Sequence, residues 1–257
     1  MSNQTMVDPK IQRLENIKER IKPRLGNLYY LSLSDLLILM RRFATNDSIK
    51  VLDYGAGNSP YASLFPNAVY HRADYMDFEG VDFKVNEDSK LPLDSDTYDL
   101  VLSTQVAEHL LSPASYFSEA FRVLKPGGRL IVTTHGVWED HGVPFDFQRW
   151  TIDGLRRDLQ CAGFSVSQMW KMTTCGRFYI YMLQHWMFPG GLRRGTFVNK
   201  VLRRCGRLVA DLVRSPLNYL ADCLWPDCRV VEQDQLEKHS MYCGIAADVV
   251  KPNACSR

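Results

Sequence analysis

The chain has 257 residues, of which 46% are hydrophobic and 23% are charged, and its net charge is +2. This composition excludes a disordered chain, and the length suits one α/β domain with additions. Because so small a net charge gives no general attraction to polyanions, we expect no nucleic-acid partner.

The cysteines and the first residues bear on the cellular compartment. Seven cysteines are present without the spacing of a disulfide framework, and the N-terminal segment is polar. We therefore expect free thiols in a reducing, cytoplasmic environment. Cys223 and Cys228 could ligate a metal, but no second cysteine pair or nearby histidine accompanies them in sequence, so we predict no metal site. No apolar run reaches the ~20 residues that a membrane-spanning helix needs.

Two helices are expected before the first strand. Apolar residues at helical spacing predict the first helix over 10–22, where Pro23 ends it, and the second over roughly 28–43. Together they form an N-terminal helical flank, which we assign to residues 1–46.

From residue 47 onward the pattern changes to alternating strands and helices. This alternation predicts a doubly wound, mostly parallel α/β sheet over a core of residues 47–174. A helical insertion is expected at 175–238, and a final strand and tail at 239–257. The expected strands lie at 49–53, 69–73, 82–85, 98–103, 129–134, 164–169 and 240–249, and the expected core helices lie at 113–124 and 152–162.

The run VLDYGAGNSP, residues 51–60, is the most informative motif. Its two glycines allow a buried strand to turn tightly and leave backbone N–H groups facing a ligand. Ser59 could cap a following helix, and Pro60 suits the first turn of one. Asp74 lies 21 residues after Asp53, near the offset at which a strand-end carboxylate meets ribose hydroxyls.

Four sequence blocks in order resemble the Rossmann-fold, type 11 family of S-adenosylmethionine-dependent methyltransferases. They are VLDYGAGNSPYASLF from residue 51, EDSKLPL from residue 87, YDLV followed by QVAEHL from residue 98, and RVLKPGG from residue 122. The resemblance implies a seven-stranded Rossmann-like sheet, an enzyme, and S-adenosyl-L-methionine as the cofactor. A dehydrogenase that uses NAD would fit the glycine loop alone but not the other blocks.

Carried over by position, the resemblance also implies which residues hold the cofactor. The commoner family pattern has a third glycine where this chain has Ser59, so we expect the first core helix to start differently and to be short. The implied contacts are Asp53, Gly55, Ala56 and Gly57 around the methionine part, Asp74 at the ribose, Glu87 or Asp88 at the adenine, and Gln105 at the methionine end.

The loop after the fifth strand, residues 133–151, carries the candidate catalytic groups. Methyl transfer to a hydroxyl needs a group that takes the proton, and a histidine with a pKa near neutrality suits this task. We predict His141 or His135 as the general base, with Asp146 orienting it or binding a sugar hydroxyl. His109 is a rival, and the adjacent Glu108 is expected to have a structural or cofactor-gating role.

The same loop supplies the predicted substrate contacts and the predicted acceptor class. Arg149 is a candidate for binding a phosphate or carboxylate, although it could instead pair with Asp146 or Asp153. Trp138 is a candidate acceptor contact. The spacing of His141, Pro144, Asp146, Arg149 and Thr151 resembles that of family members associated with polysaccharide biosynthesis, which implies a saccharide or a cell-surface, lipid-linked acceptor. A small-molecule or quinone-type acceptor, and a non-catalytic binding protein, are the alternatives.

One further segment suggests a possible membrane partner. Residues 198–214 have an apolar helical face and a basic one. Such a helix could lie on anionic lipid as a peripheral contact at the inner face of the membrane, or it could dock on its own domain with a solvated basic face. The oligomeric state is left open by the sequence.

Overall fold

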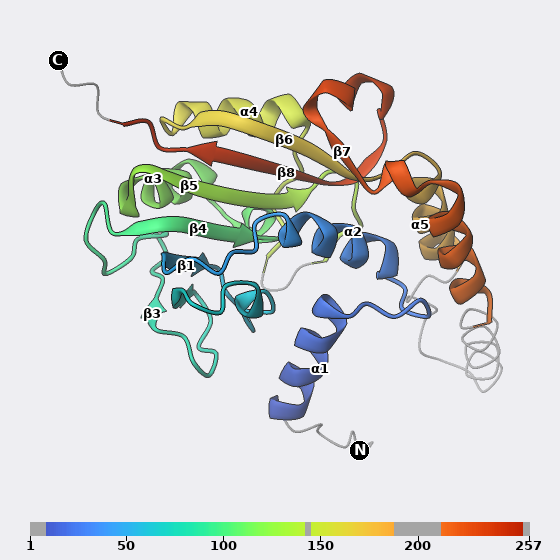
Figure 1. The fold of residues 1–257 in the computed structure, drawn as a ribbon, viewed down its shortest axis with the longest axis horizontal. Coiled ribbons are helices and arrows are strands. Elements are labelled where there is room, and N and C mark those ends of the chain that lie inside the picture. Colours follow the sequence, from blue (N-terminus) through green and yellow to red (C-terminus); the bar gives the residue numbers. More distant parts are fainter. Residues whose placement is uncertain (1–8, 142–144, 188–211, 254–257) are drawn as a thin grey trace.

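The computed structural model describes residues 9–141, 145–187 and 212–253. Within these ranges the chain forms an eight-stranded sheet in the order β3-β2-β1-β4-β5-β8-β6-β7 (Figure 1). The strands are β1 (Lys50–Tyr54), β2 (Val69–Asp74), β3 (Phe83–Lys84), β4 (Tyr98–Thr104), β5 (Leu124–His135), β6 (Ser165–Thr174), β7 (Val230–Glu232) and β8 (Tyr242–Val250).

The strand directions place a ligand site at one edge of this sheet. β3, β2, β1, β4 and β5 are mutually parallel, whereas β8 runs antiparallel to both β5 and β6. The order reverses between β1 and β4, since the chain builds outward from β1 in one direction and then from β4 in the other. Open α/β sheets bind their ligands beyond the carboxyl ends of the strands at such a switch point.

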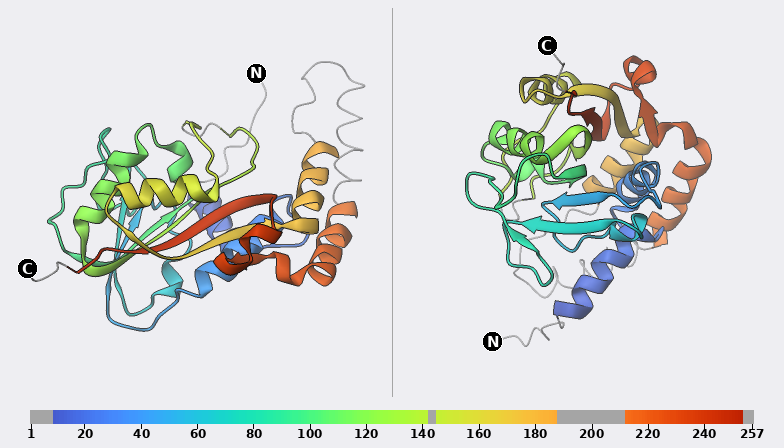
Figure 2. Two further views of the ribbon diagram at one scale, coloured as in Figure 1. Left: turned by 90° about the horizontal axis from the view of Figure 1, so that it is seen from above. Right: turned by 60° about the vertical axis from the view of Figure 1, so that its left-hand side comes forward.

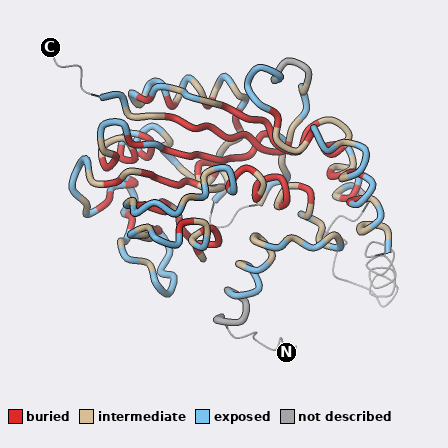
Figure 3. Tube along the Cα trace, viewed as in Figure 1, coloured by how far each residue is buried: buried red, intermediate tan, exposed pale blue. Residues whose placement is uncertain are grey.

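Helices cover both faces of the sheet (Figure 2). α3 (Pro113–Val123) and α4 (Ile152–Cys161) pack on one face, and α2 (Tyr30–Arg41) packs on the other. Because both faces are covered, most residues of β1, β4 and β8 and the second half of β5 are buried (Figure 3). This explains why their sequences are apolar runs rather than alternating patterns. α1 (Pro9–Ile21) precedes this layer and extends away from the sheet (Figure 1).

The described parts of the insertion, residues 175–187 and 212–238, pack beside the end of the sheet and are held there by buried charges. Their helices are α5 (Cys175–Met187) and a helix over residues 212–224. The Arg177 guanidinium is fully buried between Asp35 of α2, with Nη2 2.6 Å from Oδ1, and Asp222, with Nη1 2.7 Å from Oδ1. Thr173 on β6 also donates to Asp35, at 2.8 Å. One cation therefore connects α2, β6, α5 and the helix at 212–224.

The predicted doubly wound, mostly parallel sheet is confirmed, as is the short start of the first core helix, which is only the 3₁₀ turn Ala62–Leu64. Two details were wrong. The sheet has an eighth strand, because β7 within the predicted helical insertion pairs with β6. Ser59 does not cap a helix: it is buried with a φ of 49°, and no side chain caps the 3₁₀ turn.

The predicted peripheral membrane contact through 198–214 falls almost wholly outside the described residues and stays a prediction. Among the helices that the structure describes, none combines the length and the apolar character needed to cross a bilayer.

Asp35→Ala tests how strongly the buried charges hold the insertion. The change leaves the Arg177 cation without its bidentate partner, and removal of one member of a buried pair costs about 3–5 kcal/mol. We expect the free energy of unfolding, measured with urea, to fall by that amount. The matched control is Arg24→Ala, which breaks the exposed pair of Arg24 with Glu19 and should cost less than about 1 kcal/mol. Equal effects of the two changes would refute a special role for the buried pair.

Candidate functional site

A cavity of about 960 Å³ opens at the switch point of the sheet. Residues that follow β1, β4 and β5 line it, so it lies where the topology predicts a ligand site. One part of its wall comes from the glycine loop after β1, and another from the histidine-rich segments after β4 and β5. The two halves that the sequence assigns to cofactor and acceptor thus share one cavity.

The glycine loop is shaped by two different constraints. Gly55 has a φ of +82°, and a Cβ there would lie 2.4 Å from Val106 Cγ2, so only glycine fits. Gly57 has a φ of +50°, but nothing lies within 4 Å of its notional Cβ. Asp74 at the end of β2 holds the backbone at Gly57 in place, because its Oδ2 accepts a hydrogen bond from the Gly57 N–H at 2.7 Å. Its Oδ1 accepts one from the Met76 N–H at 2.8 Å.

This half of the cavity fits the nucleoside cofactor that the resemblance implies. The open space at Gly57 borders the Asp74 carboxylate, each oxygen of which accepts one hydrogen bond from the backbone. Each oxygen therefore has a second lone pair that can accept from a ribose hydroxyl. Of the residues predicted to hold S-adenosylmethionine, those that line the cavity are Gly55, Ala56, Gly57, Asp74, Glu87 and Gln105.

Asp53 and Asp88 are not among the lining residues. The Asp53 carboxylate is buried, and the Tyr70 hydroxyl donates to its Oδ2 at 2.7 Å. Burial raises the pKa of this carboxyl group to about 6. Asp53 therefore lies behind the loop, where it joins β1 to β2, and the structure does not place it beside the methionine part of a cofactor.

The acceptor half centres on His135 and Glu108. His135 ends β5 and lines the cavity, and its Nε2 lies 3.1 Å from Oε1 of the buried Glu108. Oε2 of Glu108 accepts from Thr134 at 2.8 Å, whereas Oε1 has no aligned hydrogen bond in the described part of the chain. A buried carboxylate oxygen requires a donor, so the proton of a neutral His135 belongs on Nε2, and Nδ1 carries the free lone pair.

The pKa values of this pair agree with that assignment. Burial lowers the pKa of His135 below its ordinary value, although the carboxylate of Glu108 opposes the shift. For Glu108, burial raises the pKa, but the contact with His135 outweighs it and leaves the pKa below the ordinary value. At neutral pH the pair is an imidazole beside a carboxylate, and the imidazole is in the form that can accept a proton.

His141 and Asp146 are close, but Asp146 is already engaged. The His141 backbone N–H donates to Asp146 Oδ2 at 3.0 Å, and its Nδ1 lies 3.5 Å from the same oxygen. Arg149 binds both Asp146 oxygens, with Nη2 2.7 Å from Oδ2, and this contact holds the pKa of Asp146 well below its usual range. Neither Asp146 nor Arg149 lines the cavity, whereas His141 does.

An aromatic stack that includes one predicted contact forms the next part of the wall. Trp138 stacks on His135 with centroids 4.1 Å apart, and its other neighbours are Tyr181 of α5 and Tyr29 before α2. The Tyr29 hydroxyl donates to Glu139 at 2.8 Å. Tyr29 was not predicted as a site residue, because nothing local in the sequence indicates that a residue 110 positions before Glu139 lies in the same wall.

Two groups of side chains in the described ranges bring three potential metal ligands together. One lies at the cavity and consists of Glu108, His109 and His141. The other, Cys175, Cys228 and His239, lies beside the insertion. In both groups the ligand atoms lie within 4.8 Å of one another. The sequence indicated neither group, since each includes one ligand from a distant segment, His141 in the first and Cys175 in the second.

Comparison with known proteins agrees with this geometry. Residues 29–168, more than half of the chain, match the family model described as a methyltransferase domain. Over 92 residues the chain is 44% identical to a probable S-adenosylmethionine-dependent methyltransferase of Mycolicibacterium smegmatis, which covers 34% of this chain and 36% of the relative. It is 35% identical over 71 residues to the malonyl-acyl-carrier-protein O-methyltransferase of Hahella chejuensis, and this match covers 28% of this chain and 25% of the relative. The chain thus spans little more than a third, or less, of these relatives' length.

A solved structure extends the likeness to the whole fold. The cyclase SpnF superposes with a TM-score of 0.53 at 16% identity, over 95% of this chain and 97% of that protein. At this level of identity the similarity is one of fold alone.

Glu108→Gln tests the charge relationship at His135. Because the Glu108 carboxylate raises the pKa of His135 against the effect of burial, its neutralisation should lower that pKa further. NMR titration of the imidazole should give a wild-type value below ~6.5, the reference for an exposed histidine, and a lower one in the variant. Asp153→Asn on the exposed face of α4 is the control and should change nothing. A higher pKa in Glu108→Gln would contradict the arrangement.

Proposed function

This chain belongs to the methyltransferase-domain family, and on that premise we propose that it transfers the methyl group of S-adenosylmethionine to an oxygen atom of a hydroxylated acceptor. The observation that carries the proposal is the single cavity in which the open glycine loop and the His135–Glu108 pair face the same space. A loop that binds a nucleoside and an imidazole in its proton-accepting form are the two components that O-methylation needs.

In the cofactor half, the chain's residues bind and orient. Backbone N–H groups of the loop and the carboxylate of Asp74 would hold the methionine and ribose parts, with Glu87 toward the adenine and Gln105 near the sulfur. Bound there, S-adenosylmethionine supplies an electrophilic methyl group on a positively charged sulfur. Gln105 has a φ of 57°, an unusual conformation for a residue with a side chain, and such strain concentrates at functional sites.

In the acceptor half, His135 is our candidate general base. With Nε2 3.1 Å from Glu108, its Nδ1 would take the hydroxyl proton as the oxygen attacks in line, and the buried carboxylate would stabilise the imidazolium that forms. This is the arrangement in which a carboxylate fixes the tautomer of a catalytic histidine. His141, whose ring centroid lies 5.0 Å from that of His135, is the second candidate base. Asp146 then orients the loop through Arg149 rather than acting on the acceptor.

For the acceptor we propose a saccharide hydroxyl, on a molecule that also has an apolar part. Tyr29, which is exposed, and Trp138 both line the cavity and give part of its wall an aromatic, amphipathic surface on which a sugar ring could pack. The cavity rim also exposes large apolar side chains, which favours a lipid-linked saccharide over a free one. They are Met76, Phe78, Leu111, Phe145 and Phe147.

Two alternatives to a saccharide methyltransferase are a methyltransferase with another acceptor and a protein that binds the cofactor without catalysis. The same apolar rim would suit a quinone-type small molecule. The name of the Hahella relative denotes an O-methyltransferase that acts on a carrier-bound malonyl group. That relative therefore methylates an oxygen atom, but its acceptor is not a sugar. The fold is shared with a cyclase, so a chain of this fold could also bind the cofactor without transferring its methyl group.

Asp74→Ala tests the cofactor half. Loss of charge-assisted hydrogen bonds, each worth about 1.5–3 kcal/mol, should weaken S-adenosylmethionine binding about 10- to 100-fold. Isothermal titration calorimetry measures the affinity directly. The control is Asp82→Asn, because Asp82 accepts from the Arg72 backbone and does not line the cavity. Undiminished affinity in Asp74→Ala would remove the proposed ribose contact.

His135→Gln tests the acceptor half. Wild-type protein should transfer an isotopically labelled methyl group to one class in a panel of free saccharides, lipid-linked saccharides and quinols, detected by mass spectrometry. In His135→Gln we expect kcat to fall about 10²–10⁴-fold, while calorimetry shows the cofactor affinity unchanged. A fall of this size in His141→Ala and not in His135→Gln would make His141 the base. Cofactor binding without transfer to any hydroxyl would favour the non-catalytic alternative.

A further inference from the structure

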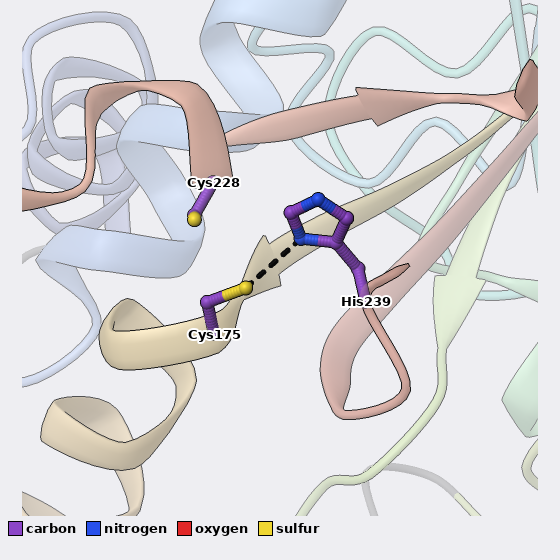
Figure 4. A group of neighbouring side chains, drawn as sticks. All are labelled: Cys175, Cys228 and His239. Atoms are coloured by element: carbon purple, nitrogen blue, oxygen red, sulfur yellow. Dashed lines mark hydrogen bonds between the residues drawn. The ribbon is translucent and has the colours of Figure 1, made fainter. Parts of the chain in front are cut away.

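A second cluster of reactive side chains lies away from the cavity wall just described. Cys175, Cys228 and His239 point toward one another, as Figure 4 shows, and the Cys175 Sγ lies 2.9 Å from His239 Nδ1. The two sulfurs and the imidazole nitrogen all lie within 4.8 Å of one another. The methyl-transfer proposal uses none of these three residues.

The three side chains come from segments that meet only in the folded chain. Cys175 begins α5 directly after β6, Cys228 ends the 3₁₀ turn Pro226–Cys228, and His239 follows the 3₁₀ helix Gln233–Lys238 before β8. Cys228 is buried, and the other two are partly accessible. A bond to a shared ion would therefore link the sheet, α5 and the β7 region at one point.

The local backbone holds Cys175 in place at a cost. Its φ is 49°, a left-handed conformation that costs of order 1–3 kcal/mol in a residue with a side chain. The next residue must be glycine, because a Cβ on Gly176 would lie 2.2 Å from the Trp225 ring. Trp225 packs on this junction and precedes the turn that carries Cys228, so one contact positions both thiols.

The chemistry of the donors selects the ion. Two thiols and an imidazole are soft and borderline ligands, which suit Zn²⁺ and exclude Mg²⁺ and Ca²⁺. Tetrahedral bonds of about 2.3 Å to sulfur and 2.0–2.1 Å to nitrogen place S and N about 3.6 Å apart. The shortest contact of the cluster would thus lengthen by less than about 1 Å, and the two thiols would bind as thiolates and release their protons to solvent.

We propose that Cys175, Cys228 and His239 bind one Zn²⁺ ion, with water or an unidentified ligand in the fourth position. The ion fixes the insertion, and with it α5 and Tyr181, against the end of the sheet. Its role is structural, because the cluster lies outside the residues that line the cavity. The inference is independent of whether the chain transfers methyl groups.

Cobalt substitution tests the site in the full-length, reduced protein. Addition of Co²⁺ should produce sulfur-to-cobalt charge-transfer absorbance. Zn²⁺ should then displace the Co²⁺ and abolish this absorbance at about one Zn²⁺ ion per chain. In Cys175→Ser and Cys228→Ser the absorbance should fall, and Zn²⁺ affinity should drop by at least the ~10–100-fold that even an outer hydrogen-bonding partner of a metal ligand is worth. His239→Asn should retain sulfur-to-cobalt absorbance with weakened affinity.

Matched controls separate this cluster from other metal-binding groups. Cys161→Ser and Cys223→Ser remove exposed thiols and should leave the spectrum unchanged. His109→Ala disrupts the metal-ligand group at the cavity, whose donors are oxygen and nitrogen atoms only. This change should therefore also leave the sulfur-to-cobalt band unchanged. Absence of that band in the wild-type protein would overturn the proposal. So would its persistence in both Cys175→Ser and Cys228→Ser, or a disulfide between these two residues in protein isolated with its thiols blocked.

Discussion

The packing of the described helices of the insertion depends on the buried guanidinium of Arg177. Two carboxylates face it, and Thr173 and Tyr30 supply additional hydroxyl donors to those carboxylates. Burial of a cation is favourable only when its partners sit at the correct distances, so the network tolerates few arrangements of α2, α5 and the helix at 212–224. Hydrophobic contacts alone would allow these helices to slide, since apolar packing has no direction. The charges therefore contribute specificity of packing more than they contribute net stability.

The Arg177 network also affects the wall of the cavity, because Arg177 and Tyr181 lie on the same helix, α5. Tyr181 lies one helical turn after Arg177 and stacks on Trp138, which in turn stacks on His135. The imidazole is thus confined between an aromatic ring on one side and the Glu108 carboxylate at its edge. A general base is effective only when its lone pair is directed at the proton it takes. Orientation of His135 is consequently a property of the insertion as well as of the sheet.

The sequence predicted the parts of this molecule that are encoded locally. The turn after β1 was predictable, because a short motif carries both the glycines and the strand before them, and so were the helices whose apolar residues repeat at helical spacing. Asp53 and Asp74 both lie at strand ends and were both predicted to contact the cofactor, yet Asp74 faces the glycine loop whereas Asp53 faces Tyr70. This difference is set by side-chain direction, which spacing in the sequence does not encode. Arg177, Tyr29 and the Cys175–Cys228–His239 cluster were not predictable, because each acquires its partners from segments separated by tens of residues.

Left-handed backbone conformations occur in both of these regions, as well as at Ser89 and Asp96. Ser59 and Gln105 adopt left-handed conformations beside the cofactor half of the cavity, and Thr173 and Cys175 do so at the junction of β6 and α5. Such conformations persist only where the surroundings over-determine them. At the second region the Thr173 hydroxyl donates to Asp35, and the Trp225 ring packs against Gly176, the residue after Cys175. Because Tyr181 of α5 follows this junction and stacks on Trp138, the junction also helps to place the aromatic wall beside His135.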